Sequence, residues 1–281
     1  MRSPPQDSEC TMLRRFLTIL CFLCFCSSLC ARELTERSDW REYFRNAQVQ
    51  GVFVLCRQNA NNCQTSDLQR ASEGFVPAST FKILEALIAL ETGVLRDGRE
   101  VFHWNGQKRP FKIWENDFTL RGAMQNSVEP IFQELARRIG EERMRHHIAQ
   151  ANYGNADISG GADHFWLDGA LRVSATEQIE FLSHLYYAEL PFSERNQLIV
   201  QEAMLTEAAN AYILRSKTGY SLGMPGYNDA TKPGLAWWMG WVEKDADLYF
   251  FAANFDIDKN EKLAFRKSIP RRIMTAEGIL Q

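Results

Sequence analysis

A serine and a lysine stand three positions apart, at Ser79 and Lys82 within PASTFK, directly before the apolar run ILEALIAL. Residues three apart on a helix are neighbours on one face, so the lysine amine can reach the serine hydroxyl. An uncharged amine can take the hydroxyl proton and leave a strong nucleophile, and apolar neighbours favour the uncharged form. The alternative is that Ser79 only caps the helix, because serine is common at helix N-termini.

A second motif, Lys217-Thr218-Gly219, follows a β-rich run and is the only KTG in the chain. A glycine at a strand edge lets a substrate backbone come close enough to hydrogen-bond with the main chain. The adjacent lysine offers a cation to a substrate carboxylate. A strand that ends in a glycine turn explains the same residues without any function, so this motif alone is weak.

Ser127, in MQNSVEPIF, lies in the sequence between these two motifs and directly before a predicted helix. A hydroxyl placed between two lysines can relay a proton to a leaving nitrogen. The alternative is an N-cap without a catalytic role. Together the three motifs read S-x-x-K, then a serine about 50 residues later, then KTG, and this order favours one shared site.

The elements that must position these residues follow from the hydrophobic patterns and the helix signals. They are a strand at residues 50–56, helices at 83–93 and 129–140, a helix after the capping box at 174–177, strands at 212–219, 235–244 and 248–255, and a closing helix at 265–280. The helix at 83–93 is apolar on nearly all sides, so it is expected to be buried. The sequence predicts an α+β fold, with a mainly antiparallel sheet flanked by helices and an all-helical part.

The chain has 281 residues, of which 45% are hydrophobic, and a formal net charge of −3. This composition supplies a sizeable core and gives no electrostatic case for binding nucleic acid or an anionic membrane surface. No repeat, low-complexity tract or linker interrupts the sequence after residue 31. Residues 32–281 are therefore predicted to form a single domain, and the sequence carries no indication of its oligomeric state.

Residues 1–31 are predicted to be a secretory signal peptide. The basic pair Arg14-Arg15 precedes an uncharged run from Phe16 to Ala31, FLTILCFLCFCSSLCA. This run is shorter than the roughly 20 apolar residues of a membrane-spanning helix, so no stable membrane anchor is expected. Met12 is an alternative start. The prediction is secretion across the inner membrane, to the periplasm if the source is Gram-negative.

Five of the seven cysteines lie within or before this signal, and the mature chain keeps Cys56 and Cys63. An even pair in an exported protein favours a disulfide, here across the polar, turn-forming stretch RQNANN. The alternative is two separate buried thiols.

The five histidines do not indicate a metal site. His146 and His147 are adjacent, so they point to different faces of a helix, and no H-x-H or H-x-x-x-H spacing occurs. Zinc-dependent hydrolysis is therefore not expected, and no metal ligands are predicted.

The three motifs resemble those of the serine penicillin-recognising enzymes. More specifically, the chain resembles a class D β-lactamase, or oxacillinase, over nearly all of its mature length. The segments that carry this resemblance are PASTFK, YGN at residues 153–155, FWLDGALRVSA at 165–175, SKTGY, AWWMGWVE and KLAFRKSIP. The fold that it implies is that of the β-lactamases and transpeptidases.

The resemblance implies that Ser79 attacks the β-lactam carbonyl and forms an acyl-enzyme. It also implies that Lys82 is carboxylated by dissolved CO2 or bicarbonate, and that this N6-carboxylysine is the general base for acylation and deacylation. Trp166 would donate its indole N–H to the carbamate, and Leu167 would help to screen the site from bulk water. No bound cofactor is expected beyond CO2 or bicarbonate. Without the resemblance, Trp166 is more simply a core aromatic residue.

The oxyanion hole implied by the resemblance consists of the backbone N–H groups of Ser79 and Tyr220. Such preorganised donors typically lower a barrier by about 3 kcal/mol. Ser127, with Lys217 nearby, would pass a proton to the β-lactam nitrogen.

The substrate carboxylate would be held by Thr218 and Arg266, beside Gly219. Arg266 lies in LAFRKS, where the alternative is a solvated charge on a helix. The implied function is hydrolysis of small β-lactam antibiotics by a class D serine β-lactamase, which confers resistance.

One position departs from the class D pattern. The family has Ser-x-Val where this chain reads Ser127-Val128-Glu129, and that valine would flank the carboxylated lysine. A carboxylate at Glu129 could repel the carbamate, or pair with an unmodified Lys82 and keep it cationic, and either effect would weaken deacylation. The third alternative is that Glu129 points away, as an acid favoured at a helix start. We predict that activity survives in altered form.

Two other functions share the nucleophile. One is a penicillin-binding transpeptidase or carboxypeptidase that acts on D-Ala-D-Ala peptides, which would usually carry an extra domain or a membrane anchor. The other is a sensor domain that is acylated by β-lactams without turnover, which would follow several transmembrane helices. The sequence shows none of these additional segments, and therefore favours the β-lactamase.

Overall fold

The computed structural model describes residues 33–280 of the chain except 59–61, 169–170, 222–233 and 258–259. The chain divides into two units, Met1–Ala31 and Arg32–Gln281, and the fold below is that of the second unit. The predicted signal peptide lies outside the described residues, so it and the predicted domain limits stay predictions. Among the residues described, no helix is long and apolar enough to cross a membrane.

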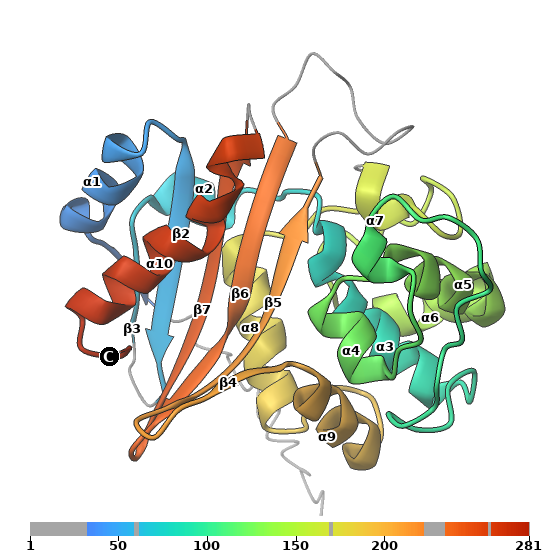
Figure 1. Ribbon diagram of the computed structural model, residues 1–281. Helices are drawn as coiled ribbons and strands as arrows, with labels where there is room; N and C mark the ends of the chain where they lie inside the picture. Colours follow the sequence, from blue (N-terminus) through green and yellow to red (C-terminus); the bar gives the residue numbers. More distant parts are fainter. Residues whose placement is uncertain (1–32, 59–61, 169–170, 222–233, 258–259, 281) are drawn as a thin grey trace, which may run out of the picture. The chain divides into compact units, whose positions relative to one another are not determined.

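Seven strands in the described part of the chain form one sheet, in the order β1-β3-β2-β7-β6-β5-β4 (Figure 1). They are β1 (Glu33–Glu36), β2 (Gly51–Arg57), β3 (Asn62–Thr65), β4 (Leu205–Ala208), β5 (Ile213–Tyr220), β6 (Gly234–Lys244) and β7 (Asp247–Ile257). β1 and β3 run parallel, and every other neighbouring pair is antiparallel. The predicted, mainly antiparallel sheet with three neighbouring strands late in the chain is confirmed.

The strand β6 pairs with β7 along its whole length, and its side chains alternate between two cores. Trp237, Met239 and Trp241 enter the larger core, whereas Ala236 and Trp238 enter the smaller one. Successive side chains of a strand point to opposite faces of the sheet. Because both faces are covered, the run AWWMGWV is apolar throughout instead of alternating.

Helices cover both faces of the sheet. They are α1 (Ser38–Asn46), α2 (Leu68–Ser72), α3 (Lys82–Glu91), α4 (Leu120–Gln125), α5 (Glu129–Ile139), α6 (Glu141–Gln150), α7 (Phe165–Asp168), α8 (Ala175–Tyr186), α9 (Glu194–Ala203) and α10 (Phe265–Ala276). α1 and α10 pack against the smaller core, while α8 contacts β2, β6 and β7 from the other face. The remaining helices, except α2, extend beyond α8 as the predicted all-helical part (Figure 1).

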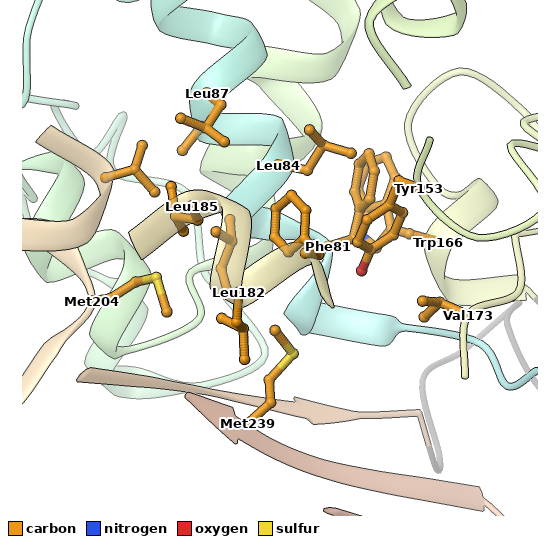
Figure 2. Close-up of a cluster of buried hydrophobic side chains, with 14 of the residues drawn as sticks. Phe81, Leu84, Leu87, Tyr153, Trp166, Val173, Leu182, Leu185, Met204 and Met239 are labelled. Carbon is orange, nitrogen blue, oxygen red and sulfur yellow. The ribbon is translucent and has the colours of Figure 1, made fainter. Parts of the chain in front are cut away.

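The helix α3 is buried on all sides, as its apolar sequence predicts. Every residue of α3 except Glu91 is buried. Figure 2 shows Phe81 and Leu84 within the larger core, with Trp166 beside Phe81. Burying one such side chain contributes about 1.5–3 kcal/mol, so this packing fixes the helix firmly. The direction of Lys82, the first residue of α3, is thereby fixed as well.

A disulfide joins Cys56 of β2 to Cys63 of β3. The two residues lie directly opposite each other in the antiparallel pairing of these strands, with their Cα atoms 4.4 Å apart. Both side chains are buried. The bond therefore joins the two strands of a short hairpin, across the polar stretch that the sequence marks as a turn.

Candidate active site

Ser79 lies on a single 3-10 turn, Ala78–Thr80, which leads directly into α3. The Nζ atom of Lys82 donates a hydrogen bond of 2.7 Å to Oγ of Ser79. The cap position of α3 belongs to Phe81, and no side chain forms a capping hydrogen bond there. The geometry therefore pairs the serine with the lysine and gives no support to the capping alternative.

Three further hydrogen bonds hold the turn in place. Oγ1 of Thr80 donates to the carbonyl of Pro77 at 2.7 Å and accepts from Nε2 of Gln178 at 3.0 Å. The indole N–H of Trp237 donates to the carbonyl of Val76 at 2.9 Å. The turn is thus tied to α8 and to β6, which restrains the nucleophile relative to the sheet.

The carboxylate of Glu129 lies against Lys82. Its Oε2 atom accepts a hydrogen bond from Nζ of Lys82, and its Oε1 atom accepts one of 3.1 Å from the indole N–H of Trp166. Lys82 is fully buried and Glu129 is 4% exposed, so the ion pair is shielded from water. The ring of Phe132 also lies 5.3 Å from Nζ of Lys82. Glu129 does begin α5, but it points toward Lys82, not away from it.

Ser127 and Lys217 form the second polar contact of the site. Nζ of Lys217 donates to Oγ of Ser127 and also to the carbonyl of Thr218, at 2.9 Å. Burial, followed by the nearby positive charge of Lys82, lowers the pKa of Lys217 well below its usual range. A lysine with a lowered pKa gives up a proton readily, and the hydroxyl in contact with it can pass that proton on.

Two residues of the site have backbones in the left-handed region without being glycine. Ala78, directly before Ser79, has φ 48°, and Ser127 also has φ 48°. Such conformations cost on the order of 1 kcal/mol and persist only where the surroundings hold them, often at ligand-binding sites. The strain therefore lies at the turns that carry the two serine hydroxyls.

A cavity of about 480 Å³ opens onto these groups. Its walls include seven residues that the sequence analysis discusses: Ser79, Ser127, Glu129, Thr218, Gly219, Tyr220 and Arg266. The buried residues Lys82, Lys217, Trp166 and Leu167 do not line this cavity. Ser79 and Glu129 thus line the same cavity. Lys82 lies buried behind them and contacts both residues.

The sequence analysis missed part of the cavity wall. Phe111, Ile113 and Trp114 line it, and the first two are at least half exposed. They come from an irregular segment around a 3-10 turn, Lys112–Trp114, where no periodic pattern exists. The sequence feature that could have indicated this part of the wall is the presence of three apolar residues within a polar segment. Large exposed apolar side chains at the mouth of a cavity are typical of a binding site for a partly apolar ligand.

Gly219 lets β5 lie directly against the turn that carries Ser79. A Cβ atom at Gly219 would lie 2.9 Å from the carbonyl oxygen of Pro77 and 3.1 Å from Cβ of Trp237. Contacts below 3 Å with a backbone atom require the chain to move. The glycine of the KTG motif therefore sets the separation between the strand and the nucleophile.

A second carboxyl, that of Glu85, is buried one turn further along α3. It is fully buried, and neither of its oxygens has a hydrogen-bond partner in the described part of the chain. Burial raises the pKa of Glu85 well above its usual range, the positive charge of Lys82 opposes this rise, and the negative charge of Glu129 adds to it. Burial thus favours the uncharged form of the Glu85 carboxyl.

Replacing Glu85 with methionine is expected to raise the free energy of unfolding by about 1–3 kcal/mol, because two buried oxygens without partners are removed at similar volume. Urea unfolding at pH 7 measures this difference. The contrasting variant is Glu91→Met, at the end of the same helix. It is expected to lower the free energy of unfolding, because Glu91 accepts hydrogen bonds from Ser193 and Asn196. No gain for Glu85→Met would contradict the expectation.

The described residues contain no group of three or more histidine, cysteine, aspartate or glutamate side chains able to hold a metal ion. The chemistry that the site offers is a serine nucleophile next to a lysine, a second lysine–serine pair whose serine lines the same cavity, and an arginine in the cavity wall. This combination is suited to acyl transfer from a substrate that carries a carboxylate.

The sequence relatives agree with this chemistry. Residues 46–275 match the family described as the penicillin binding protein transpeptidase domain. The chain is 50% identical to β-lactamase OXA-10 of Pseudomonas aeruginosa over 95% of this chain and 99% of the relative. It is 46% identical to β-lactamase OXA-48 of Klebsiella pneumoniae over 89% and 92%, and 38% identical to β-lactamase OXA-2 of Salmonella typhimurium over 85% and 84%. The chain belongs to the penicillin-binding transpeptidase-domain family and, within it, to the class D β-lactamases.

The carbamate that the resemblance implies on Lys82 does not fit this arrangement of side chains. Its predicted donor, the indole N–H of Trp166, is bound to Glu129, and the same carboxylate is bound to Nζ of Lys82. The place next to the lysine thus already contains a carboxylate that belongs to the chain. The reaction proposed below therefore uses no carbamate.

Proposed function

We propose that the protein hydrolyses β-lactam antibiotics through an acyl-enzyme on Ser79 and thereby confers resistance to them. The observation that carries this proposal is the 2.7 Å hydrogen bond between Nζ of Lys82 and Oγ of Ser79 at the wall of the cavity. Membership of the class D β-lactamases supports the substrate class. Small β-lactam molecules are thus the expected partners.

In acylation, Oγ of Ser79 bonds to the β-lactam carbonyl carbon, and its proton passes to the pair formed by Lys82 and Glu129. The C–N bond of the lactam then breaks. The leaving nitrogen takes a proton from Oγ of Ser127, which regains one from Lys217, in contact with it. This order of steps uses the two lysine–serine contacts for opposite purposes, one removing a proton and the other delivering one.

Backbone and side-chain groups in the cavity wall orient the substrate. The backbone N–H groups of Ser79 and Tyr220 are assigned to the carbonyl oxygen, which becomes negatively charged in the transition state. Thr218 and Arg266 are assigned to the substrate carboxylate, and their place on the wall of the same cavity supports this. Leu167, which is 3% exposed and follows Trp166, is assigned to excluding water.

We further propose that the protein is exported, that residues 1–31 are removed, and that the mature chain keeps the Cys56–Cys63 disulfide. A chain made for an oxidising compartment explains why the two remaining cysteines lie at directly opposed strand positions. Mass spectrometry of the exported chain, before and after reduction, identifies the cleavage site and detects the disulfide.

The test of the function is turnover of a chromogenic cephalosporin by the purified mature protein. Many product molecules per enzyme are expected. A single stoichiometric burst would instead indicate a penicillin-binding transpeptidase or a sensor domain. The absence of any reaction would overturn the proposal.

Replacing Gly219 with alanine is expected to lower kcat/KM in this assay about 10²-fold, because a displacement of about 1 Å between reacting groups has an effect of this size. The matched control is Gly98→Ala, whose Cβ would meet only the side chain of Ile199, at 3.0 Å, and which should leave kcat/KM unchanged. Equal values for both variants would show that the close approach of β5 does not set the geometry of the site.

A further inference from the structure

The carboxylate of Glu129 bridges the amine of Lys82, next to the nucleophile, and the buried indole of Trp166. Both of its oxygens are bound, one by Lys82 and the other by Trp166, and the side chain is almost completely buried. These two donors hold the carboxylate in one orientation. A buried carboxylate fixed in this way is preorganised to accept a proton.

The same contacts oppose carboxylation of Lys82. CO2 would have to add to Nζ of Lys82, where the carboxylate of Glu129 is already in contact. A carbamate would also place a second negative charge beside Glu129 in a site shielded from water, where like charges strongly disfavour each other. Lys82 is therefore a poor target for CO2 in this chain.

Glu129 also reaches the space where the acyl group forms. It lines the same cavity as Ser79, whereas Lys82 does not. A water molecule in that cavity can approach the ester carbon on Ser79 and the carboxylate of Glu129 together. Lys82, in contact with both residues, connects them on the buried side.

We propose that Glu129 is the general base of deacylation in this protein and takes the place of a lysine carbamate, so that turnover needs no CO2. This inference rests on the proposed β-lactam hydrolysis. It assigns to a side chain of the protein the task that the family resemblance assigns to a modification. The substitution that breaks the family pattern is thus part of the mechanism and does not impair it.

Deacylation begins once the proton that Ser79 gave to the Lys82–Glu129 pair has passed through water in the cavity to Lys217, which gave one to the leaving nitrogen. At this point Glu129 is a carboxylate and Lys82 an ammonium. The water oxygen bonds to the acyl carbon while one of its protons passes to Glu129. The bond from that carbon to Oγ of Ser79 then breaks, Oγ takes a proton from Lys82, and Lys82 takes back the proton held by Glu129. One water is consumed, the acid is released, and all three side chains return to their starting states.

The first test removes the charge of Glu129 at constant shape. In buffer freed of CO2, Glu129→Gln is expected to become acylated but to release product about 10²–10⁴-fold more slowly than the unaltered enzyme, the usual contribution of a general base. A burst of one equivalent and a stable acyl-enzyme in intact-protein mass spectrometry would record this. The size of the burst also reports the folded fraction, so a variant that fails to fold cannot be mistaken for a slow one.

The second test restores the family residue. Glu129→Val is expected to turn over only when bicarbonate is added, because valine leaves the place beside Nζ of Lys82 and the indole N–H of Trp166 open to a carbamate. The unaltered enzyme is expected to show equal turnover with and without bicarbonate. The matched control is Glu85→Gln, which changes the other buried carboxyl near Lys82 and should keep both the rate and its independence of bicarbonate.

The outcomes separate this inference from the proposed function. If the unaltered enzyme turns over only with bicarbonate, or if Glu129→Gln turns over at nearly the same rate without CO2, Glu129 is not the base, although the protein is still a β-lactamase. If the unaltered enzyme shows a lysine carbamate after labelling with 13C-bicarbonate, the inference is overturned as well. If it does not react with the cephalosporin at all, the proposed function itself fails.

Discussion

Replacement of Ser79 by alanine is expected to reduce turnover of a chromogenic cephalosporin by about 10⁶-fold, the scale on which hydrolases lose activity when a serine nucleophile is removed. The reason is that the only hydroxyl in contact with Lys82 is lost, among the residues described, and with it the covalent intermediate. Folding should change little, because one hydrogen bond contributes about 1 kcal/mol.

Intact-protein mass spectrometry distinguishes a lost nucleophile from a distorted site. The unaltered protein should gain the mass of the opened β-lactam, and Ser79→Ala should gain none. Ser183→Ala, within α8, is the control and should be acylated normally. Acylation of Ser79→Ala at an unchanged rate would show that another residue is the nucleophile.

Replacement of Lys82 by methionine is expected to lower the free energy of unfolding by about 3–5 kcal/mol and to abolish acylation. The large effect on stability follows from Glu129, which would remain buried without its counter-charge. Breaking a buried ion pair by removing one partner typically has an effect of this size. Urea unfolding at pH 7 measures the stability, and the burst of product measures acylation.

The double variant Lys82→Met with Glu129→Leu separates stability from chemistry. Replacing both charges by apolar side chains of similar volume is expected to recover most of the lost stability, because neither charge is then buried alone. Acylation should remain absent, since the lysine that exchanges a proton with Ser79 is gone. If the single variant Lys82→Met were as stable as the unaltered protein, the pair would not be a buried ion pair in solution.

Much of this site could be predicted from local motifs, because each motif lies at the end of a regular element. S-x-x-K begins α3, Ser127 precedes α5, and KTG lies at the end of β5. The family resemblance indicated that these motifs form one site. The contacts of Lys82 with Ser79 and of Lys217 with Ser127 agree with this.

The partner of Trp166 could not be predicted in the same way. The pattern FWL indicates a buried indole near the lysine, but a pattern does not say which acceptor its N–H will meet. Glu129 drew attention only as a departure from the family, and both an orientation toward Lys82 and one away from it were open. Packing decided between them, because a carboxylate at the start of α5 lies close enough to bind both Lys82 and Trp166.

Some of the elements that the sequence did not indicate are regular helices, α1, α6 and α9, of 9, 10 and 10 residues, and the others are short or irregular segments. β1, β3 and β4 have four residues each, too few to show an alternating pattern. The cavity wall at Phe111 and Ile113 belongs to no long element, so its apolar residues have no period to follow. Such segments are positioned by tertiary contacts that only the folded chain provides.

The burial of Glu85 also links folding to proton uptake. Its carboxyl is ionised in the unfolded chain above the ordinary pKa of about 4.5 and, with its raised pKa, protonated in the folded one. Between pH 4.5 and the raised pKa of the folded state, the folded chain therefore binds one more proton than the unfolded chain. The contribution of Glu85 to stability is fully present below pH 4.5 and declines as the pH rises toward the folded-state pKa. The enzyme thus carries within α3 a site that makes its fold more stable as its surroundings become more acidic, opposite to the effect of paired carboxylates such as that of Asp39, whose pKa is lowered.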